Sequence, residues 1–427
     1  MTTPPIHRVV IAGGGTAGWM AAAAIARTMG RTVAVTLVES EAIGTVGVGE
    51  STIPPIVTFN RLLGINEAEF MRETQATFKL GILFDNWKDR GETYFHSFGT
   101  TGKDHWSAGF QHFWLHGLTR GHHQPFDDYC LELRAALQGK FAHLPDGRMN
   151  YAYQLDSGLY ARFLRKMAEA DGTTRVEGRI AQVELNGESG DIAALTLDSG
   201  ARIEGDLFLD CTGFRALLIE QALHAGFDDW THFLPCDSAI AVQTESVRPA
   251  LPYTRAIAHD AGWQWRIPLQ HRTGNGIVYC SRYLDHDAAL ERLLGTVEGP
   301  TLTEPNRIRF VTGARRQQWH RNCVAIGLAG GVHGVARIDE HPSDPARHPP
   351  SAADVPIGRD QSARRRRIQR TAAYRHAADP RFPDPPLQGD QPPRQRLLAT
   401  MRVDAGARFA RAQDRTLPRD RPRLPQE

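Results

Sequence analysis

The sequence contains few cysteines, and they are not placed as metal ligands or disulfide partners. Its 427 residues include five, an odd number, far apart and never in a CxxC pair. They are Cys130, Cys211, Cys236, Cys280 and Cys323. This spacing argues against a zinc site and against a disulfide framework, so we expect isolated thiols in the core.

The histidines offer no recognisable metal site either. Those from His96 to His123 lack a fixed helical spacing and a companion carboxylate, as in HxD or HExxH. We therefore expect no bound metal, and we expect these side chains on the surface or in a substrate pocket.

Long apolar runs are also missing. No segment approaches about 18 uninterrupted apolar residues, the length that a membrane-spanning helix needs. Residues 1–11 lack the basic stretch, apolar run and cleavage site of a secretory signal. We expect a soluble, cytoplasmic protein, and the 41% hydrophobic content supplies the core of one large two-part domain or of two ordinary domains.

Most of the chain has no surplus of positive charge. Residues 332–427 carry 19 arginines against 12 acidic residues, which leaves 31 basic against 36 acidic residues in 1–331. The front three quarters are therefore mildly acidic, although the formal net charge is +2. We expect no binding of nucleic acid or of an anionic membrane.

A glycine-rich turn lies between two β-branched runs near the N-terminus. The stretch HRVVIAGGGTAGWMAAAAIARTMGRTVAVTLVES, residues 7–40, predicts a strand, a turn, a helix and a second strand. Its glycines fit GxGxxG, which lets the backbone approach a pyrophosphate at the helix N-terminus. Glu39 closes the second strand, where a carboxylate accepts hydrogen bonds from a ribose 2′-OH. We predict a dinucleotide site, the alternative being a helix-capping turn, from Gly13, Gly14, Gly15, Thr16, Ala17, Gly18 and Glu39.

A second strand of this kind favours FAD over NAD. In GDLFLDCTGFRALLIEQAL, residues 205–223, a strand from Leu207 to Cys211 runs into Thr212, Gly213 and an expected helix. Flavoproteins of the glutathione-reductase and hydroxylase type leave the FAD-binding sheet and return to it in this way. We predict an α/β fold with a Rossmann-like FAD-binding domain from 1–85 and 155–230, and a substrate region from 86–154 and 231–331.

Four stretches resemble the flavin-dependent tryptophan halogenases. They are GGGTAGWMAA at 13–22, VGVGESTIPPI at 46–56, TFKLGILFDNW at 77–87, and GWQWRIPL at 262–269. The last contains the WxWxIP signature, formed by Trp263, Trp265, Ile267 and Pro268. The resemblance implies that Lys79 is the catalytic lysine. It also implies that FAD is bound by Gly49, Glu50, Ser51, Ile180, Thr212 and Gly213 in addition to the first glycine turn.

Lys79 and the tryptophans also have ordinary explanations. A single lysine is usually a solvated surface residue, but the apolar neighbours of Lys79 predict that desolvation lowers its pKa and makes the amine more reactive. Trp263 and Trp265 could simply fill a core on one face of a strand. The resemblance implies that they instead separate the substrate from the flavin.

Two further expectations concern the middle of the chain. The segment after Trp87 shapes the aromatic-substrate pocket in the family, so His96, Phe98 and Phe110 are candidate lining residues. Leu159, Phe163 and Met167 recur at helical spacing, which indicates core packing.

The resemblance implies halogenation by reduced FAD, O2 and chloride or bromide. Hypohalous acid would pass to Lys79, and the halogen would be added to tryptophan or a related electron-rich aromatic. The expected partners are this substrate and a separate NAD(P)H-dependent flavin reductase, with a homodimer possible in principle. The alternatives are a flavin-dependent aromatic monooxygenase and an inactive, truncated FAD-binding remnant.

The composition changes abruptly at Val332. The last 96 residues hold 14 of the 26 prolines and 19 arginines, but no lysine, tryptophan, cysteine or asparagine. Composition alone predicts a disordered, basic tail. The halogenase pattern, however, stops in mid-motif after NCVAIGLAGG at 322–331, where the family continues with a phenylalanine and a stretch like EPLEST.

A one-nucleotide shift gives a reading that resembles that pattern, with serine where the family usually has proline. Residues 332–345, VHGVARIDEHPSDP, can be read as FMESLESTSIHLIQ, and residues 380–392, PRFPDPPLQGDQP, as RDFLILHYKATNR. We therefore predict that 332–427 is out of frame. The glutamate that assists catalysis in the family would begin within the codon of Arg337.

Overall fold

A six-stranded sheet forms where the β-branched runs come together. The computed structural model describes residues 5–44 and 50–332. The strand order is β20-β21-β12-β1-β2-β8, and neighbouring strands are parallel except for β20 and β21. The strands are β1 Arg8–Ala12, β2 Ala34–Glu39, β8 Thr174–Glu177, β12 Leu207–Asp210, β20 Trp319–His320 and β21 Cys323–Ala325. Parallel sheets of this kind are buried on both faces, and residues 9–12 of β1 are all buried.

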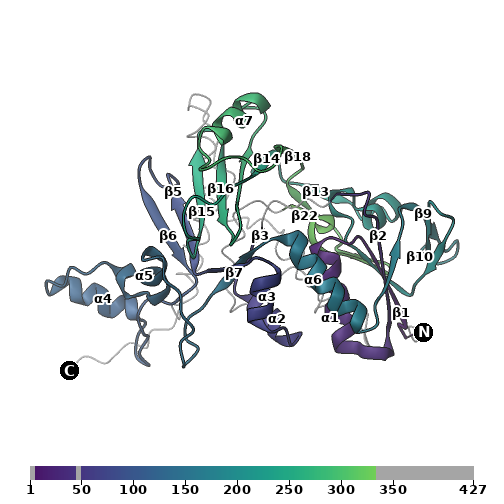
Figure 1. Cartoon of the computed structure of the whole chain (residues 1–427), viewed down its shortest axis with the longest axis horizontal. Coiled ribbons are helices and arrows are strands. Elements are labelled where there is room, and N and C mark those ends of the chain that lie inside the picture. Colours follow the sequence, from purple (N-terminus) through teal and green to yellow (C-terminus); the bar gives the residue numbers. More distant parts are fainter. Residues whose placement is uncertain (1–4, 45–49, 333–427) are drawn as a thin grey trace, which may run out of the picture.

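Two long helices cover one face of this sheet, side by side in Figure 1. They are α1 Thr16–Met29 and α6 Ser157–Ala170. Val9, Ile11 and Leu37 point into the core beneath them. The alternate residues, including Val10 and Val38, face a second core, which is completed by the sheet β9 Ile180–Leu185, β10 Ile192–Leu197 and β11 Arg202–Glu204.

The first sheet differs in part from the ranges expected for it. β20 and β21 come from the segment 231–331, which we expected in the substrate region, while β5 Gly81–Asp85 belongs to another sheet. Strands of two and three residues are too short for their periodicity to be recognised in a sequence. The helix expected after Gly213 is instead a 3₁₀ turn, η3 Gly213–Arg215, followed by a π-helix, η4 Leu217–Ala222.

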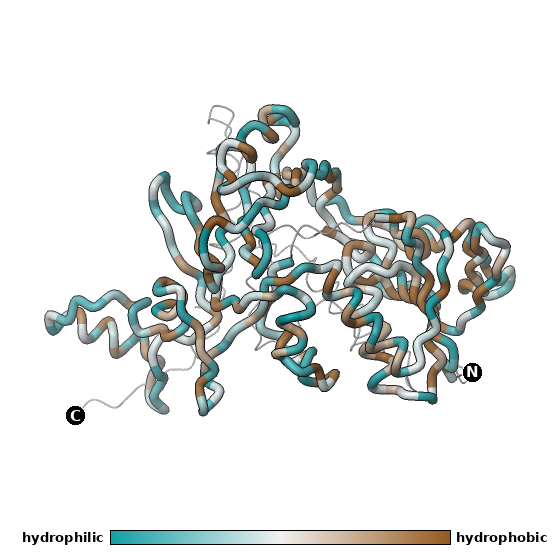
Figure 2. The backbone as a smooth tube through the Cα atoms, viewed as in Figure 1, coloured by the Kyte–Doolittle hydropathy of each residue, from teal (hydrophilic) through white to brown (hydrophobic). Residues whose placement is uncertain are grey.

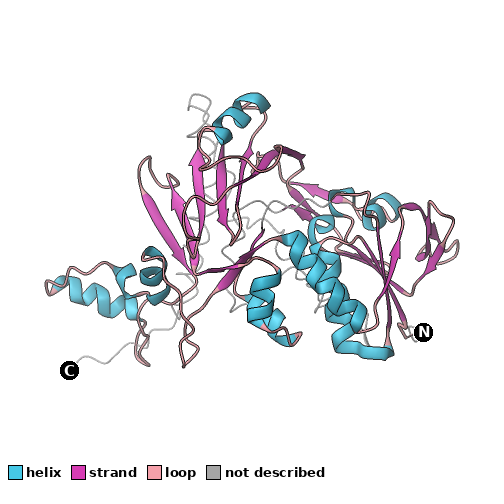
Figure 3. Cartoon of the chain, in the orientation of Figure 1, coloured by secondary structure: helices cyan, strands magenta, loops and turns pink. Residues whose placement is uncertain are grey.

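A seven-stranded sheet forms the upper part of the molecule in Figure 3. Its order is β18-β14-β17-β16-β15-β5-β6, and all pairs are antiparallel except β15 and β5. The strands are β5 Gly81–Asp85, β6 Thr93–Ser97, β14 Ser238–Thr244, β15 Thr254–His259, β16 Gly262–Pro268, β17 Thr273–Tyr279 and β18 Asn306–Arg309. The helix α7 His286–Leu294 packs on this sheet.

A small sheet connects the two large ones. Its order is β3-β7-β4, with β3 Glu50–Ser51, β4 Thr77–Lys79 and β7 Ala152–Leu155. β4 is separated from β5 by one residue, Leu80, so the chain passes directly from this sheet into the seven-stranded one. The sheet therefore carries both the residues after the VGVGE glycines and the candidate lysine.

The remaining elements lie around these sheets. They are α2 Pro55–Leu62, α3 Glu67–Glu73, α4 Phe110–Thr119, α5 Leu131–Leu137, the sheet β13 Phe227–Asp229, β19 Gly313–Arg315 and β22 Gly331–Val332, and the 3₁₀ turns η1 Gly30–Thr32, η2 Phe126–Tyr129 and η5 Gly327–Gly330. None of the helices in the described ranges is long and apolar enough to cross a membrane. Gly49 and the segment from residue 333 onward, with Arg337, lie outside the described residues.

Candidate active site

The first glycine turn has the geometry of a phosphate cradle. Gly13 has φ +108°, and a Cβ placed on it would lie 2.4 Å from the carbonyl oxygen of Cys211, so only glycine fits there. A Cβ on Gly15, in contrast, would have no atom within 4 Å. Gly15 is the N-cap of α1, where unpaired backbone N–H groups favour an anion. The turn therefore fits the pyrophosphate of a dinucleotide.

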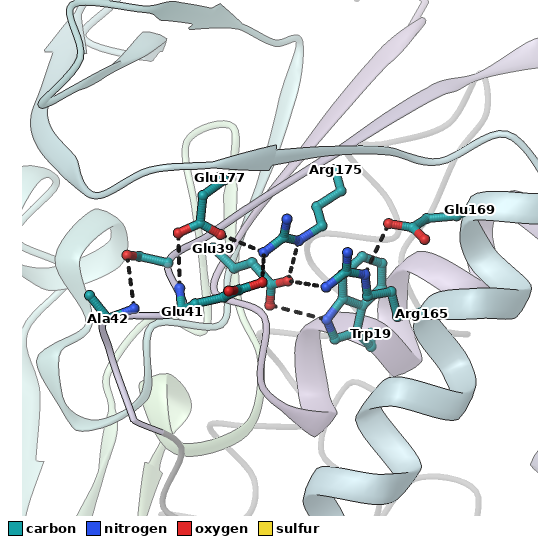
Figure 4. Close-up of polar contacts among 9 residues, drawn as sticks. Trp19, Glu39, Glu41, Ala42, Arg165, Glu169, Arg175 and Glu177 are labelled. Atoms are coloured by element: carbon teal, nitrogen blue, oxygen red, sulfur yellow. Dashed lines mark hydrogen bonds and ion pairs between the residues drawn. The ribbon is translucent and has the colours of Figure 1, made fainter.

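Glu39 lies beside this turn in a network of charged groups, shown in Figure 4. Its carboxylate accepts hydrogen bonds from Arg175 Nε at 2.6 Å and from Trp19 Nε1 at 3.2 Å. Arg175 also pairs with Glu41 and Glu177. Each carboxylate oxygen keeps a second lone pair, so Glu39 can still accept hydrogen bonds from ribose hydroxyls.

Glu50 joins the glycine turn to the small sheet. Burial raises the pKa of its carboxyl, Asp156 raises it further, and Ser157 and Arg272 oppose the shift. Ser157 is also in contact with the start of α1, because its carbonyl accepts a hydrogen bond from Thr16 at 3.3 Å. The candidate FAD-binding residues of the first and second motifs are thus neighbours.

Lys79 is fully buried, with 0% of its surface exposed, on the short strand β4. Its Nζ donates to the carbonyl oxygen of Thr52 at 3.0 Å and lies 5.0 Å from the ring centroid of Phe98. The structure therefore excludes the solvated-surface alternative. It also places the amine beside Thr52, the last residue of the VGVGEST motif, which is 27 positions earlier in the sequence.

A chain of hydrogen bonds fixes the strand that carries Lys79. The hydroxyl of Ser51 lies 2.6 Å from that of Thr254, which donates to Gln154 at 3.0 Å. Gln154 in turn donates to the hydroxyl of Thr77 at 3.0 Å. Thr77 then donates to the carbonyl oxygen of Pro268, at the end of WxWxIP, at 2.7 Å. Three motifs that are distant in sequence thus meet at β4.

The tryptophans of WxWxIP lie in the core of the seven-stranded sheet. Trp263, Trp265 and Ile267 are buried on one face of β16, packed with Ile82 and Phe84. The centroids of the two indole rings are 5.9 Å apart. The two tryptophans therefore pack in a core on one face of a strand, as their spacing in the sequence allowed.

The second glycine turn lies directly against the first. Thr212 donates through its backbone N–H and its hydroxyl to Asp210, at 3.0 and 2.6 Å. Asp210 is fully buried and also accepts from the N–H groups of Leu218 and Ile219. Gly213 follows with φ +67°. Ile180, which opens β9, packs on the core beneath this region.

The three candidate substrate residues are not all brought together. Phe98 lies under the Lys79 amine, and His96 is 6.5 Å from Phe98 between ring centroids. Phe110 instead begins α4, where it packs against Phe126 and Tyr129. Of the three candidates, only Phe98 and its neighbour His96 therefore lie near Lys79.

Several residues of the site were not singled out from the sequence. Thr52, Gln154 and Thr254 position Lys79, and Arg175 holds Glu39. Thr52 could have been noticed as the next residue of the VGVGEST motif. The other three are isolated polar residues without a motif, and the hydrogen bonds named here join them to residues 77 or more positions away.

The family comparison covers the same part of the chain. The tryptophan halogenase family model matches residues 8–334. That match ends next to Val332, where the composition of the sequence changes.

Curated relatives match over most of the described region. Tryptophan 7-halogenase RebH of Lentzea aerocolonigenes is 38% identical over 347 residues, which cover 76% of this chain and 65% of RebH. Tryptophan 6-halogenase ThaL of Streptomyces albogriseolus is 37% identical over 350 residues, with 76% and 65% coverage. The chain therefore spans a little under two thirds of the length of these relatives.

Solved structures give the same result. Xcc4156, a flavin-dependent halogenase from Xanthomonas campestris, is 53% identical with a TM-score of 0.75, and the match covers 96% of this chain and 76% of Xcc4156. BrvH, a flavin-dependent halogenase from Brevundimonas sp. BAL3, is 41% identical with a TM-score of 0.74, covering 96% and 78%. These relatives are flavin-dependent enzymes. With a family match over residues 8–334, the chain belongs to the tryptophan halogenase family.

Proposed function

We propose that the chain carries out FADH2-dependent chlorination or bromination of tryptophan or a related electron-rich aromatic. The observation that carries this proposal is the fully buried Lys79 amine at the edge of the FAD motif, 3.0 Å from the Thr52 carbonyl. Burying a lysine costs free energy, and an amine fixed beside a cofactor site can hold a reactive species in a defined position.

The residues that would hold FAD are those of the two glycine turns and their neighbours. The pyrophosphate would lie at Gly15 and the start of α1, and a ribose hydroxyl would donate to Glu39. Glu50, Ser51, Ile180, Thr212 and Gly213, with Gly49 outside the described residues, would complete the site. Bound reduced FAD, with O2, would supply the oxidising equivalents that convert halide to hypohalous acid.

Lys79 would receive that hypohalous acid and fix where the halogen is delivered. The hydrogen bond to Thr52 and the position over Phe98 hold the amine in one orientation. A fixed orientation sets which ring carbon of the aromatic substrate lies within reach. Phe98 and His96 would form part of the wall that the substrate contacts. Phe110, at the start of α4, would lie farther from Lys79.

Trp263 and Trp265 would act by excluding the substrate from the flavin. Their rings, together with Ile267, fill one face of the sheet that continues from β4. A filled layer leaves an aromatic substrate no direct route to the oxidising centre. Halogenation by a small diffusing acid would then be favoured over direct hydroxylation.

We also propose that the segment from Val332 is read out of frame and that a one-nucleotide correction restores activity. The written chain has Arg337 where the shifted frame begins the catalytic glutamate of the family. In the corrected chain that glutamate would act as a general base or polarise Lys79. A separate flavin reductase would supply FADH2, and the enzyme could act as a homodimer. The alternative of an inactive, truncated remnant applies to the chain as written.

The test uses the frame-corrected chain and its Lys79→Ala variant. With reduced FAD, O2, bromide and tryptophan or another indole, we expect brominated product from the parent. In the variant we expect product to fall by about a hundredfold or more, because loss of the group that positions the reactive species costs that much. Product is measured by mass spectrometry, and FAD binding is measured in parallel. Lys88→Ala is the control, since this lysine is solvent-exposed and pairs with Glu92.

Two results would contradict the proposal. Hydroxylated product that forms regardless of added halide would favour the aromatic monooxygenase. Unchanged bromination in Lys79→Ala would remove the lysine from the mechanism. Resequencing the gene around codon 332 separately tests the reading frame, because an uninterrupted written frame with an active product would exclude the shift.

A further inference from the structure

A pocket lies on the face of the seven-stranded sheet opposite to the tryptophans. Side chains alternate along β16, so Trp263, Trp265 and Ile267 point to one side and Arg266 to the other. The pocket has a cavity volume of about 40 Å³ and opens to solvent. Its lining includes Arg248, Tyr253, Arg255, Arg266, Asn275 and Glu298.

The charges of this pocket are unbalanced. Arg248, Arg255 and Arg266 line it, and among the described lining residues Glu298 alone is acidic. Glu298 pairs with both Arg248 and Arg266. Arg255 pairs with Asp85 at 2.7 Å. Three guanidinium groups are thus matched by two carboxylates, which leaves one positive charge to be compensated.

Two buried polar atoms at the pocket also have no hydrogen-bond partner. They are Nε of Arg266 and Oδ1 of Asn275, a residue that is 0% exposed. Arg266 is only 13% exposed at its side chain. Burial lowers the pKa of its guanidinium, and the nearby Arg255 and Arg248 lower it further against the opposing effect of Glu298. Unpaired buried polar atoms of this kind are uncommon in folded proteins.

We propose that this pocket binds a small oxyanion, a carboxylate or phosphate group, which pairs with the guanidinium groups of Arg248, Arg255 and Arg266 that line it. Such groups suit a guanidinium because the hydrogen bond is charge-assisted. The anion would also offset the surplus positive charge of Arg248, Arg255 and Arg266.

The pocket is connected to the strand of Lys79. Its lining residue Pro268 accepts the hydrogen bond of Thr77, and its lining residue Leu251 accepts one from Gln154 at 3.3 Å. The N–H of Leu80 donates to Pro252 at 2.7 Å, within the same loop. An anion held in the pocket would therefore stabilise Leu251 and Pro268, the lining residues that are hydrogen-bonded to the small sheet of Lys79. The binding itself does not depend on the proposed halogenation.

The test is calorimetric titration of the full chain with two probes at constant ionic strength. Inorganic phosphate represents a free anion, and indole-3-acetate represents a carboxylate carried by an aromatic molecule. We expect saturable binding of at least one probe at one site per chain. Whichever probe binds identifies the source of the oxyanion.

Four variants localise the binding. Arg266→Gln and the more exposed Arg248→Gln should weaken it about tenfold, as expected for loss of one charge-assisted bond. Glu298→Gln should strengthen it, because the competing carboxylate is removed. Arg90→Gln removes an equal charge from the exposed pair with Asp260 and should leave it unchanged. Thermal unfolding confirms that each variant is folded.

The proposal is overturned if neither probe binds saturably to the parent chain. It is also overturned if Arg248→Gln and Arg266→Gln bind as tightly as the parent, or if Arg90→Gln weakens binding as much as they do. Weaker binding in Glu298→Gln would likewise contradict it.

Discussion

At the scale of single residues, two glycines of one turn have different physical roles. Gly13 is required by the fold, since its φ is +108° and a Cβ would collide with the carbonyl of Cys211. Gly15 has an ordinary φ of −71° and open space around it. The open space is where a phosphate can approach the backbone.

We therefore predict that two alanine substitutions change different properties, one mainly stability and the other mainly FAD binding. Gly13→Ala should lower the free energy of unfolding by about 1–3 kcal/mol, the cost of a strained backbone residue. Gly15→Ala should lower it by no more than about 1 kcal/mol, since a helix N-cap is changed, but should weaken FAD binding. Urea denaturation measures the first quantity and quenching of flavin fluorescence the second. If Gly15→Ala binds FAD as tightly as the parent, the turn is not the phosphate cradle.

Lys79 shows how far a residue can be predicted from its sequence neighbours. The apolar stretch around it predicted desolvation, and burial of the whole side chain confirms that expectation. The partner of its amine, the carbonyl of Thr52, did not follow from the stretch. A backbone carbonyl carries no residue-specific signal, so only the packed structure identifies it.

At the scale of secondary structure, the N-terminus of α6 depends on one carboxylate. Asp156 is the N-cap, accepting from the N–H of Leu159 at 3.0 Å and from Arg272 at 2.7 Å. Burial raises the pKa of Asp156, but these two interactions outweigh it and lower the pKa overall. Arg272 is only 4% exposed, so its charge has little access to water.

The pH dependence follows from the lowered pKa. A carboxyl with a lower pKa in the folded state stabilises the fold fully above its unfolded pKa of about 3.9, and this contribution is lost as the pH falls through the folded pKa. Asp156→Asn should therefore cost about 3 kcal/mol at neutral pH, because it leaves a buried charge unpaired. The difference from the parent should narrow below about pH 4.

Chemical denaturation across the acid range checks this prediction. Glu169→Gln is the control on the same helix, since its pair with Arg165 is partly exposed and should contribute less than about 1 kcal/mol. A difference between Asp156→Asn and the parent that stays constant down to pH 3, roughly one unit below the ordinary Asp pKa, would show that the ion pair is not its origin.

The same helix shows a limit of periodicity. Leu159, Phe163 and Met167 were expected in the core, and the helix is present as Ser157–Ala170. Its fully buried positions are instead Tyr160, Leu164 and Ala168, with Phe163 and Met167 partly buried beside them. The apolar face is wide enough that neighbouring rows share the contact, and the packing against α1 decides which row is central.

At the scale of the whole molecule, large apolar side chains are exposed on the α4 lobe, residues 104–119. Figure 1 places α4 at one end, away from the six-stranded sheet, and the hydropathy colouring of Figure 2 can be followed along the same lobe. Trp106 is 91% exposed, and Phe113, Leu115 and Leu118 are also exposed. α4 has no buried residue. Exposed apolar patches promote association.

We predict that the chain self-associates through this lobe. The double substitution Trp106→Ser and Leu115→Gln should lower light scattering at a given protein concentration, while far-UV circular dichroism stays unchanged. Leu185→Gln, an exposed leucine on β9, is the matched control and should have little effect. Equal scattering from the parent and the double variant would place the association elsewhere.

The sequence alone determined the local parts of this protein. The glycine turn, its flanking strands and helix, the apolar setting of Lys79 and the strand of WxWxIP are all encoded by near neighbours, because backbone conformation and side-chain periodicity act over a few residues. Tertiary structure alone decided that β20 and β21 complete the first sheet, that Gln154 and Thr254 link the motifs, and that Arg266 faces a charged pocket behind the tryptophans. These contacts join residues 77 or more positions apart, or depend on which face of a strand is covered, and both are set by the packing of the whole chain.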